Sequence, residues 1–276
     1  MTRLTSLDVR NIPQTMKRYD LELREKTGCG LLEIAKDACR AEKNITGILR
    51  KTRAAVIPVT AGKGVIPGFC EAVAAILEYT GMKTFVTRGT DIAGIAEACE
   101  LGADVIFAAD DSKFVAINLA TKRVVDNAVA TGKAYVAALD RIAKGVEGRE
   151  VLLIGVGNVG VAAAKDLIRR KARVLAVDIN RRRLANLKKR YGNRVRVFYT
   201  VSKALLHANL IVDAAPARNI IKLNTINDDT IIAAPAVPLG LTKAALNRLG
   251  GRNLVHDPLQ LGVATMAVEA CTAWKN

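Results

Sequence analysis

The sequence predicts an α/β protein of two domains, each built on a mainly parallel sheet. The chain has 276 residues, of which 50 % are hydrophobic, so it can bury two domain cores. Short continuous apolar runs alternate with helical patterns from residue 54 onward. A glycine-rich turn joins an apolar run to a helix near the middle of the chain, at residues 155–160. Together these observations favour parallel strands with helices on both faces.

The first domain is predicted to cover residues 1–127 and to combine polar helices with a sheet. One helix is expected from Ser6 as the N-cap to Gly28, a second over residues 31–39, and a long loop over residues 41–53. Continuous apolar runs predict buried strands, and the segments between them predict helices. The strands are expected at residues 54–60, 83–87 and 103–111, and the helices at residues 68–81 and 91–102.

A connecting helix is predicted over residues 128–148, because the pattern that begins near residue 127 meets no turn signal before Gly148. The second domain, residues 149–276, again alternates strands and helices. A terminal amphipathic helix over residues 262–274 is expected to return to the first domain. The strands of the second domain are expected at residues 150–157, 173–179, 194–199, 210–216 and 230–235.

Composition narrows the class of protein. No apolar run reaches the roughly 18–20 residues of a membrane span, and the N-terminal segment lacks a hydrophobic signal region. We therefore expect a soluble, cytoplasmic protein with no membrane partner. The five cysteines are widely spaced and the chain has two histidines, so we expect reduced, buried thiols and no metal site.

The glycine-rich turn points to a dinucleotide. Gly155, Gly157 and Gly160 have GxGxxG spacing directly after an apolar strand and at the opening of a helix. The first glycine permits the tight turn, the second lets the backbone approach a pyrophosphate, and the third lets helix and strand pack closely. Free N–H groups at the helix start favour negative charge. The second domain is therefore predicted to be Rossmann-like.

Asp178 ends the next strand, 18 residues after Gly160. A carboxylate at this position accepts hydrogen bonds from the adenosine ribose hydroxyls, which favours NAD. Arg181 to Arg183 follow Asp178, and a pair of guanidinium groups can hold the 2′-phosphate of NADP. That phosphate, however, would face the carboxylate of Asp178. NAD is therefore the predicted cofactor. Its predicted ligands, including small residues and prolines after two later strands, are Gly155, Gly157, Asn158, Val159, Gly160, Asp178, Ala215, Pro216 and Pro235.

The first domain carries candidate substrate residues where its strands end. Asp110 and Asp111 close the third strand, and paired acids at an apolar strand end are costly unless they are exposed or matched to a cation. They favour a cationic substrate, with helix capping or a surface turn as the alternative. His256 and Asp257 precede the terminal helix, and a lone histidine is more often structural.

The formal net charge of +16 is unevenly distributed. The segment from Lys165 to Arg196 contains 13 basic residues and two acids. Such a field attracts anions, nucleic acid among them. Because no aromatic residues alternate with these charges, a solvated basic face is the favoured interpretation, and a nucleic-acid partner is not expected.

Several segments together resemble one known family. They are VIPVTAGKGVI, FAADDSKFVAINL, GVGNVG, DAAPA, APAVP and DPLQLGVATM, with LTSLDVRNI near the N-terminus. Read together, they are similar to the 3-methylornithyl-lysine dehydrogenases of pyrrolysine biosynthesis, over nearly the whole chain. The resemblance implies an NAD-dependent oxidation of the terminal amine carbon of 3-methylornithyl-lysine. Attack by the neighbouring α-amine, with loss of ammonia, would then close the pyrroline ring of pyrrolysine.

The resemblance also implies which residues meet this small, cationic, dipeptide-like substrate. Asp110 and Asp257 would hold ammonium groups, and one of them would accept a proton during catalysis. The chain departs from the family at Ala61, where a serine is usual, and at Asp257, where a glutamate is usual. The implied substrate residues are Leu4, Thr60, Gly62, Asp110, Asp111 and Asp257.

Two other functions remain as alternatives. A two-domain dehydrogenase of the shikimate or methylene-tetrahydrofolate type should carry a lysine–aspartate pair around an N-T-D sequence, whereas the nearest stretch is VVDNAV. A non-catalytic NAD sensor could bind nucleic acid through residues 165–196, but the paired acids argue against it. The sequence leaves open whether the chain forms a homodimer.

Overall fold

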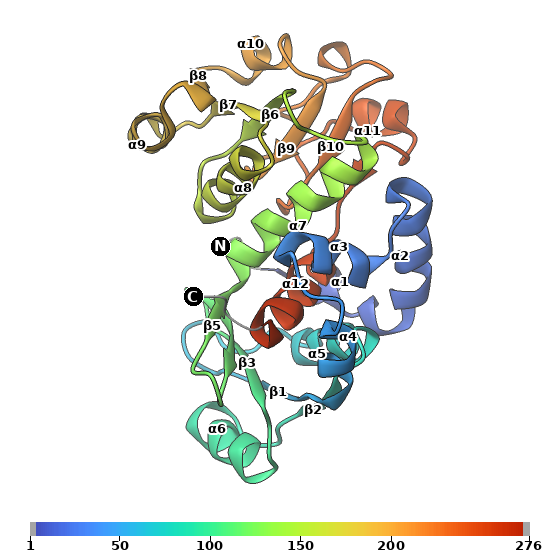
Figure 1. Ribbon diagram of the computed structural model, residues 1–276, viewed down its shortest axis with the longest axis vertical. Coiled ribbons are helices and arrows are strands. Elements are labelled where there is room, and N and C mark those ends of the chain that lie inside the picture. The colour runs from blue at the N-terminus through green and yellow to red at the C-terminus, as the bar shows by residue number, and fades with distance from the viewer. Residues whose placement is uncertain (1–3, 273–276) are drawn as a thin grey trace.

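The computed structural model describes residues 4–272 and contains two sheets joined by a long helix (Figure 1). The first sheet lies within residues 53–126 and the second within residues 150–255. Both sheets are mainly parallel and carry helices on both faces, which confirms the predicted α/β fold class. Among the described residues, no helix is both long and apolar enough to cross a membrane.

The first sheet has the strand order β2-β1-β3-β4-β5. Its strands are β1 (Arg53–Ile57), β2 (Lys83–Val86), β3 (Val105–Ala109), β4 (Phe114–Asn118) and β5 (Val124–Asp126). β1 pairs in parallel with β2 and β3, and Val56 lies opposite Val86 and Phe107. β4 and β5 add an antiparallel edge that the apolar pattern does not predict. β4 alternates between buried and half-buried residues and β5 has only three residues, so neither shows the continuous apolar run of a central strand.

Helices cover the two faces of this sheet unequally. α6 (Asp91–Glu100) packs through Ala98 on the face that carries Ala55 and Ile57. The opposite face packs against α5 (Phe69–Tyr79) and against the last helix, α12 (Gln260–Cys271).

The N-terminal segment forms four helices: α1 (Ser6–Val9), α2 (Ile12–Thr27), α3 (Leu31–Cys39) and α4 (Ile45–Lys51). The single helix expected from Ser6 to Gly28 is interrupted, and Thr5 rather than Ser6 is its N-cap. Pro13 explains the interruption, because proline fits only the first turn of a helix. Gly28, with φ +72°, ends α2 as predicted. α4 occupies the region where a loop was expected.

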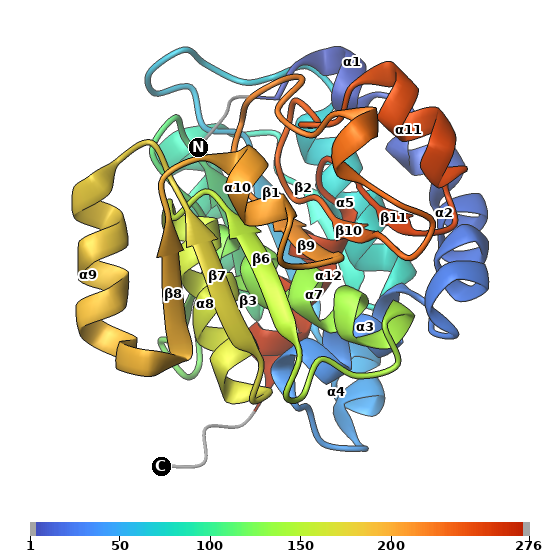
Figure 2. The same ribbon diagram turned by 90° about the horizontal axis from the view of Figure 1, so that it is seen from above.

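The second sheet has the order β11-β10-β9-β6-β7-β8 and is parallel throughout. α7, α8 and α9 pack on one face, and α10 and α11 cover the other (Figure 2). The strands are β6 (Glu150–Ile154), β7 (Arg173–Val177), β8 (Val195–Phe198), β9 (Leu210–Asp213), β10 (Ile231–Ala233) and β11 (Leu254–Val255). The helices are α7 (Asn127–Ile142), α8 (Asn158–Arg169), α9 (Arg181–Tyr191), α10 (Val201–Leu205) and α11 (Lys243–Leu249), with 3-10 turns at Gly192–Arg194 and Leu223–Thr225.

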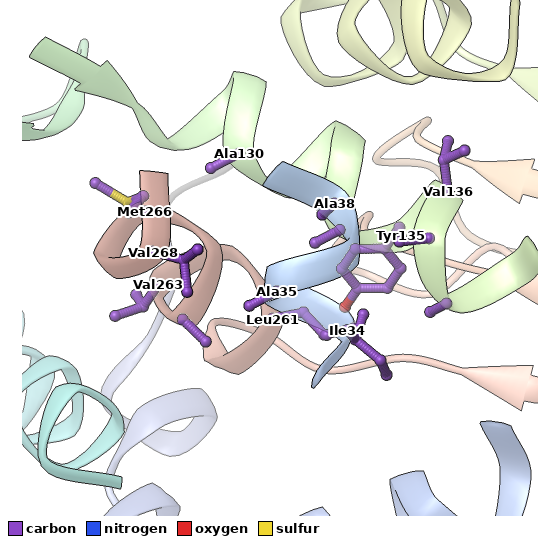
Figure 3. Close-up of a cluster of buried hydrophobic side chains, with 14 of the residues drawn as sticks. Ile34, Ala35, Ala38, Ala130, Tyr135, Val136, Leu261, Val263, Met266 and Val268 are labelled. Atoms are coloured by element: carbon purple, nitrogen blue, oxygen red, sulfur yellow. The ribbon is translucent and has the colours of Figure 1, made fainter. Parts of the chain in front are cut away.

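α3, α7 and α12 form the centre of the molecule (Figure 3). A Cβ at Gly132 of α7 would lie 2.6 Å from the carbonyl oxygen of Val159, so α7 and α8 approach too closely for any side chain there. α12 returns to the first domain and lies between α3, α5 and α7. The prediction of an amphipathic terminal helix is wrong, because α12 is buried on all sides. Its one charged residue, Glu269, is neutralised by Lys133 at 2.8 Å.

Candidate active site

The turn between β6 and α8 requires glycine at two positions. Gly155 has φ +89°, and a Cβ there would lie 2.9 Å from the carbonyl carbon of Ala214. A Cβ at Gly160 would collide with the carbonyl oxygen of Gly155. Gly157 differs, since the nearest atom to a Cβ there is Nη1 of Arg183, at 4.0 Å. The backbone at Gly157 is therefore open to an approaching group.

The start of α8 fits an anion. Gly157 is the N-cap of this 12-residue helix and has no side chain to accept from its first N–H groups. Exposed Asn158 and half-buried Val159 open the helix. The helix dipole and free N–H groups favour negative charge at this end, so a pyrophosphate fits here.

The carboxylate of Asp178 is held beside the glycine turn. Its Oδ2 accepts a 2.6 Å hydrogen bond from the N–H of Val156, and its Oδ1 accepts one of 2.6 Å from the N–H of Asn180. The next residue, Ile179, is fully exposed (101 %). A fully exposed apolar side chain next to a carboxylate that is held in place offers a surface on which a flat ring can pack.

Two loops continue the same edge of the second sheet. The N–H of Ala214 donates to the carbonyl oxygen of Ile154 at 2.8 Å, which joins the loop after β9 to the glycine turn. The N–H of Ala236 donates to the carbonyl oxygen of Asp213 at 3.3 Å, which joins the loop after β10 to β9. The predicted cofactor residues Ala215, Pro216 and Pro235 lie in these loops.

Asp213 is a buried acid that the sequence analysis did not select. Its side chain is fully buried, Oδ1 accepts from the N–H of Ala215 at 3.3 Å, and Oδ2 has no hydrogen-bond partner among the described residues. Burial raises the pKa of this carboxyl to about 7. Gly240 covers it so closely that a Cβ there would collide with Oδ2. The available signal was an acid at the end of the apolar run LIVD.

The loops after two strands of the first sheet bring Gly62, which lies two residues after Thr60, together with Asp111. Oδ2 of Asp111 accepts from the N–H of Lys63 at 2.8 Å, and a Cβ at Gly62 would collide with this oxygen. Asp110 is exposed, and its Oδ1 accepts from the N–H groups of Ser112 and Lys113, each at 2.7 Å. The two acids therefore brace their turn and also stand at the open edge of the sheet.

Asp91 is a second acid at this edge that the sequence analysis did not select. Its φ of +53° is unusual for a residue with a side chain. Oδ1 accepts from the N–H of Thr60 at 2.9 Å, and Oδ2 accepts from the Thr60 hydroxyl. These hydrogen bonds lower the pKa of Asp91, which stays ionised and fixes Thr60. An acid at the start of a helix is usually interpreted as capping, so no local pattern marks Asp91 as a site residue.

Asp257 is 4 % exposed and lies among four donors. Oδ2 accepts from the hydroxyls of Tyr19 at 2.7 Å and Tyr135 at 2.9 Å, while Oδ1 accepts from the N–H groups of Leu259 at 3.0 Å and Leu261 at 3.2 Å. Burial, followed by the charge of Asp257, raises the pKa of both tyrosines well above the usual value. The phenols therefore stay protonated and act as donors.

His256 and Leu4, the remaining residues that the sequence singled out, have structural contacts. Nδ1 of His256 donates to the carbonyl oxygen of Ala234 at 2.8 Å, so this histidine anchors the loop after β10. Leu4 is half-buried and packs against the main core. No hydrogen bond joins Asp110 to Asp257 in the part of the chain that the structure describes. The site thus consists of a dinucleotide turn and a separate acidic strand edge.

The fold and the glycine turn define a nicotinamide-dependent dehydrogenase. Residues 134–238 match the family model described as "Alanine dehydrogenase/PNT, C-terminal domain". The structure resembles quinate dehydrogenase from Corynebacterium glutamicum in complex with NAD, with a TM-score of 0.54 and 15 % identity over 80 % of this chain and 92 % of that one. Shikimate dehydrogenase from Aquifex aeolicus gives a TM-score of 0.53 and 14 % identity, over 76 % and 88 % of the two chains. At these identities the likeness concerns the fold.

The family follows from the sequence comparisons. Residues 8–125 match the family model described as "Pyrrolysine biosynthesis protein PylD, N-terminal domain". Pyrrolysine synthase from Methanosarcina acetivorans is 30 % identical over 266 residues, which cover 96 % of this chain and 98 % of that protein. The chain therefore belongs to the family of pyrrolysine-biosynthesis dehydrogenases, which confirms the resemblance drawn from its motifs. The shikimate-type enzymes share its architecture.

Proposed function

We propose that this protein catalyses the NAD-dependent oxidation of 3-methylornithyl-lysine and its closure to pyrrolysine. The observation that carries the proposal is the match to pyrrolysine synthase over nearly the whole of both chains. The acidic edge of the first sheet supports it, because this substrate carries three amines and one carboxylate. Its formal charge of about +2 suits a site lined with carboxylates.

The second domain would hold the cofactor. The open backbone at Gly157 and the start of α8 would bind the pyrophosphate, and Asp178 would accept from the ribose hydroxyls. Exposed Ile179 would cover the adenine ring. When bound, the cofactor supplies a nicotinamide ring that takes up a hydride. A 2′-phosphate would meet the carboxylate of Asp178, which two backbone N–H groups hold in place, and this supports NAD over NADP.

The first domain would bind the amines of the substrate. Asp110 and Asp111 stand exposed at the end of β3, and Asp91 holds Thr60 at the end of β1. Of the two proposed catalytic acids, Asp110 is the better placed base, because its side chain is exposed and, among the described residues, only its Oδ1 accepts hydrogen bonds. Asp257 is buried and its two oxygens already accept four hydrogen bonds, so it is less accessible to a substrate ammonium.

The chemistry balances as one oxidation and one exchange of amines. Asp110 takes a proton from the terminal ammonium, and the neighbouring carbon then loses hydrogen with its electron pair as a hydride. The α-amine nitrogen attacks the oxidised carbon to form a new C–N bond. The original C–N bond breaks, ammonia leaves, and loss of a proton completes the ring C=N bond. Positioning of the two reacting centres contributes to the rate beyond the proton transfer.

The direct test mixes the purified protein with NAD and synthetic 3-methylornithyl-lysine. Reduced-cofactor absorbance should grow in step with a product of pyrrolysine mass and with released ammonia. NADP in place of NAD should give a much lower kcat/KM. Binding of NAD without reduction would refute the substrate assignment and leave the cofactor site standing. Turnover of shikimate or quinate under the same conditions would favour the other enzyme class.

A further inference from the structure

The positive charge of the second domain falls into two structurally different parts. At the end of α8, Arg170 forms ion pairs with Asp37, Asp140 and Asp166, and Lys171 pairs with Glu147. Eight further basic residues lie between Arg181 and Arg196, with no acid among them. We call this segment, α9 through the start of β8, the basic end.

The charge of the basic end is not neutralised within the fold. All eight basic side chains are exposed, and none forms an ion pair with a described residue. Among the described residues, Lys188 is the one member of the eight whose side chain forms a hydrogen bond, because its Nζ donates to the carbonyl oxygens of Gly192 and Val195. Half of the formal net charge of +16 thus sits on 16 consecutive residues.

Aromatic rings do accompany these charges. The guanidinium carbon of Arg181 lies 5.4 Å from the ring centre of Tyr199, that of Arg190 lies 5.4 Å from Tyr191, and that of Arg196 lies 4.8 Å from Phe198. Tyr199 is 70 % exposed. The sequence expectation of a basic face without aromatic partners is therefore wrong, because Tyr191 ends α9, Phe198 ends β8 and Tyr199 follows it. Phe198 is buried, so exposed Tyr199 is the ring most open to a base.

A purely structural role accounts for only part of this charge. β8 is the outermost strand of its sheet, and charged residues such as Arg196 protect an edge strand from pairing with another chain. That role does not require the basic residues of α9, which lies beside β8 at the outer end of the sheet, far from α2 and α3 (Figure 2). Six basic residues on one 11-residue helix oppose folding through their mutual repulsion.

We propose that the basic end binds single-stranded nucleic acid without sequence specificity. Six of its eight basic residues are arginines, whose planar guanidinium groups bind phosphates in a bidentate manner and stack on flat rings. Arginines beside aromatic rings on a positively charged face are the combination that holds a sugar–phosphate strand together with its bases. The 11 residues of α9 extend about 16 Å, enough to contact several consecutive phosphates of one strand.

The same features favour nucleic acid over an anionic membrane. A membrane surface recognises charge but gains nothing from ring-stacked guanidiniums. Leu184 and Leu187, the leucines of α9, are buried against the sheet, so the helix has no apolar face to insert.

The experiment measures binding of fluorescently labelled oligouridine by fluorescence anisotropy over a series of salt concentrations. The test variant carries Lys189→Gln and Arg190→Gln in the last turn of α9 and Arg194→Gln in the 3-10 turn that follows it. Arg183, which lies next to Gly157, is left unchanged. A matched control carries Lys43→Gln, Arg50→Gln and Lys51→Gln, which are also exposed and remove the same charge. Thermal unfolding of both variants establishes that they are folded.

The wild type and the control should bind oligouridine with similar affinity and a steep salt dependence. The test variant should bind more weakly, and the slope of log K against log salt should shrink by about 2, at 0.7 per lost phosphate contact. Saturating NADH should not displace the strand. Equal loss in both variants, displacement by NADH, or equal affinity for duplex would overturn the proposal. So would binding to phosphatidylserine vesicles without binding to oligouridine.

Discussion

The phenol oxygen of Tyr19 lies 2.7 Å from Oδ2 of Asp257, and 238 positions of sequence separate the two residues. Tyr19 belongs to α2, whereas Asp257 directly precedes α12, and Tyr135 of α7 donates to the same oxygen. One buried carboxylate thus joins the N-terminal helices, the connecting helix and the last helix. Its orientation depends on all three.

Tyr19→Phe should therefore destabilise the fold. The substitution removes a hydrogen bond to a buried, charged acceptor, which typically contributes about 1.5–3 kcal/mol. We expect a loss of this size in the free energy of unfolding, measured by denaturant titration. Tyr191→Phe is the matched control, because the buried hydroxyl of Tyr191 has no partner among the described residues and its removal should be neutral or stabilising. Equal effects of the two substitutions would contradict the role assigned to Tyr19.

Two glycines of one turn should respond differently to alanine. Gly157→Ala meets open space and a φ of −75°, so the unfolding midpoint should stay close to that of the wild type. The added methyl group should occupy the approach path of the pyrophosphate and weaken NAD binding at least tenfold. Gly155→Ala should instead lower the unfolding midpoint, because it strains a φ of +89° and meets Ala214. Calorimetry of NAD binding and of thermal unfolding distinguishes the effects of the two substitutions. A lower unfolding midpoint for Gly157→Ala would contradict an open backbone at this position.

Asp178→Ala should weaken NAD selectively. Loss of a charged acceptor for the ribose corresponds to a decrease of roughly 10- to 100-fold in the affinity for NAD. The preference for NAD over NADP should become smaller, because Arg181 to Arg183 remain. Titration of both cofactors by fluorescence measures the ratio. An unchanged ratio would show that Asp178 only braces Val156 and Asn180.

Asp110→Asn should lower kcat by about 10²–10⁴-fold with little change in NAD affinity or unfolding, if the side chain is the general base. The amide oxygen can still accept from Ser112 and Lys113, so the turn should persist. Asp257→Asn, in contrast, should lower the stability, because an amide N–H₂ would face phenol or backbone donors. Full activity of Asp110→Asn would exclude the proposed proton transfer.

The raised pKa of Asp213 should make the stability of the fold depend on pH in a specific way. Because burial raises its pKa from 3.8 to about 7, the folded protein holds a proton that the unfolded chain releases between these values. The stability contributed by the protonated form is complete below pH 3.8 and is lost as the pH rises towards 7. Relative to Asp213→Asn, the wild type should lose up to about 1.4 kcal/mol per pH unit across this window. Denaturant titrations of both proteins at several pH values measure the difference, and parallel curves would contradict the raised pKa.

Local sequence patterns predicted the central parts of the fold well. The strands β1, β3, β6 and β7 are continuous apolar runs, and each is buried on both faces. The glycine turn was predicted because the need for glycine at positions 155 and 160 arises from contacts within one strand–turn–helix unit. The apolar pattern was weak in β4, in which burial alternates, and in the short β5 and β11. These strands depend on pairing with their neighbours.

The acidic residues show the limit of local reasoning. Asp110 and Asp111 stand out because they adjoin each other after an apolar run. The hydrogen bond of Asp91 to Thr60 and that of Tyr19 to Asp257 join distant segments, and no local pattern encodes either. The amphipathic prediction for α12 failed for the same reason, since a helix surrounded by other helices needs no polar face.

The burial of α12 also bears on the order in which the chain folds. β1 to β5 are synthesised first, yet one face of their sheet packs against residues 260–271. The first domain therefore cannot complete its core while the second is still being made, although domains commonly fold as independent units during synthesis. A chain that stops before residue 260 would leave uncovered the surfaces of α3, α5 and β4 that α12 contacts. Folding of this protein is thus complete only when α12 packs against the first domain, so the two domains become stable together.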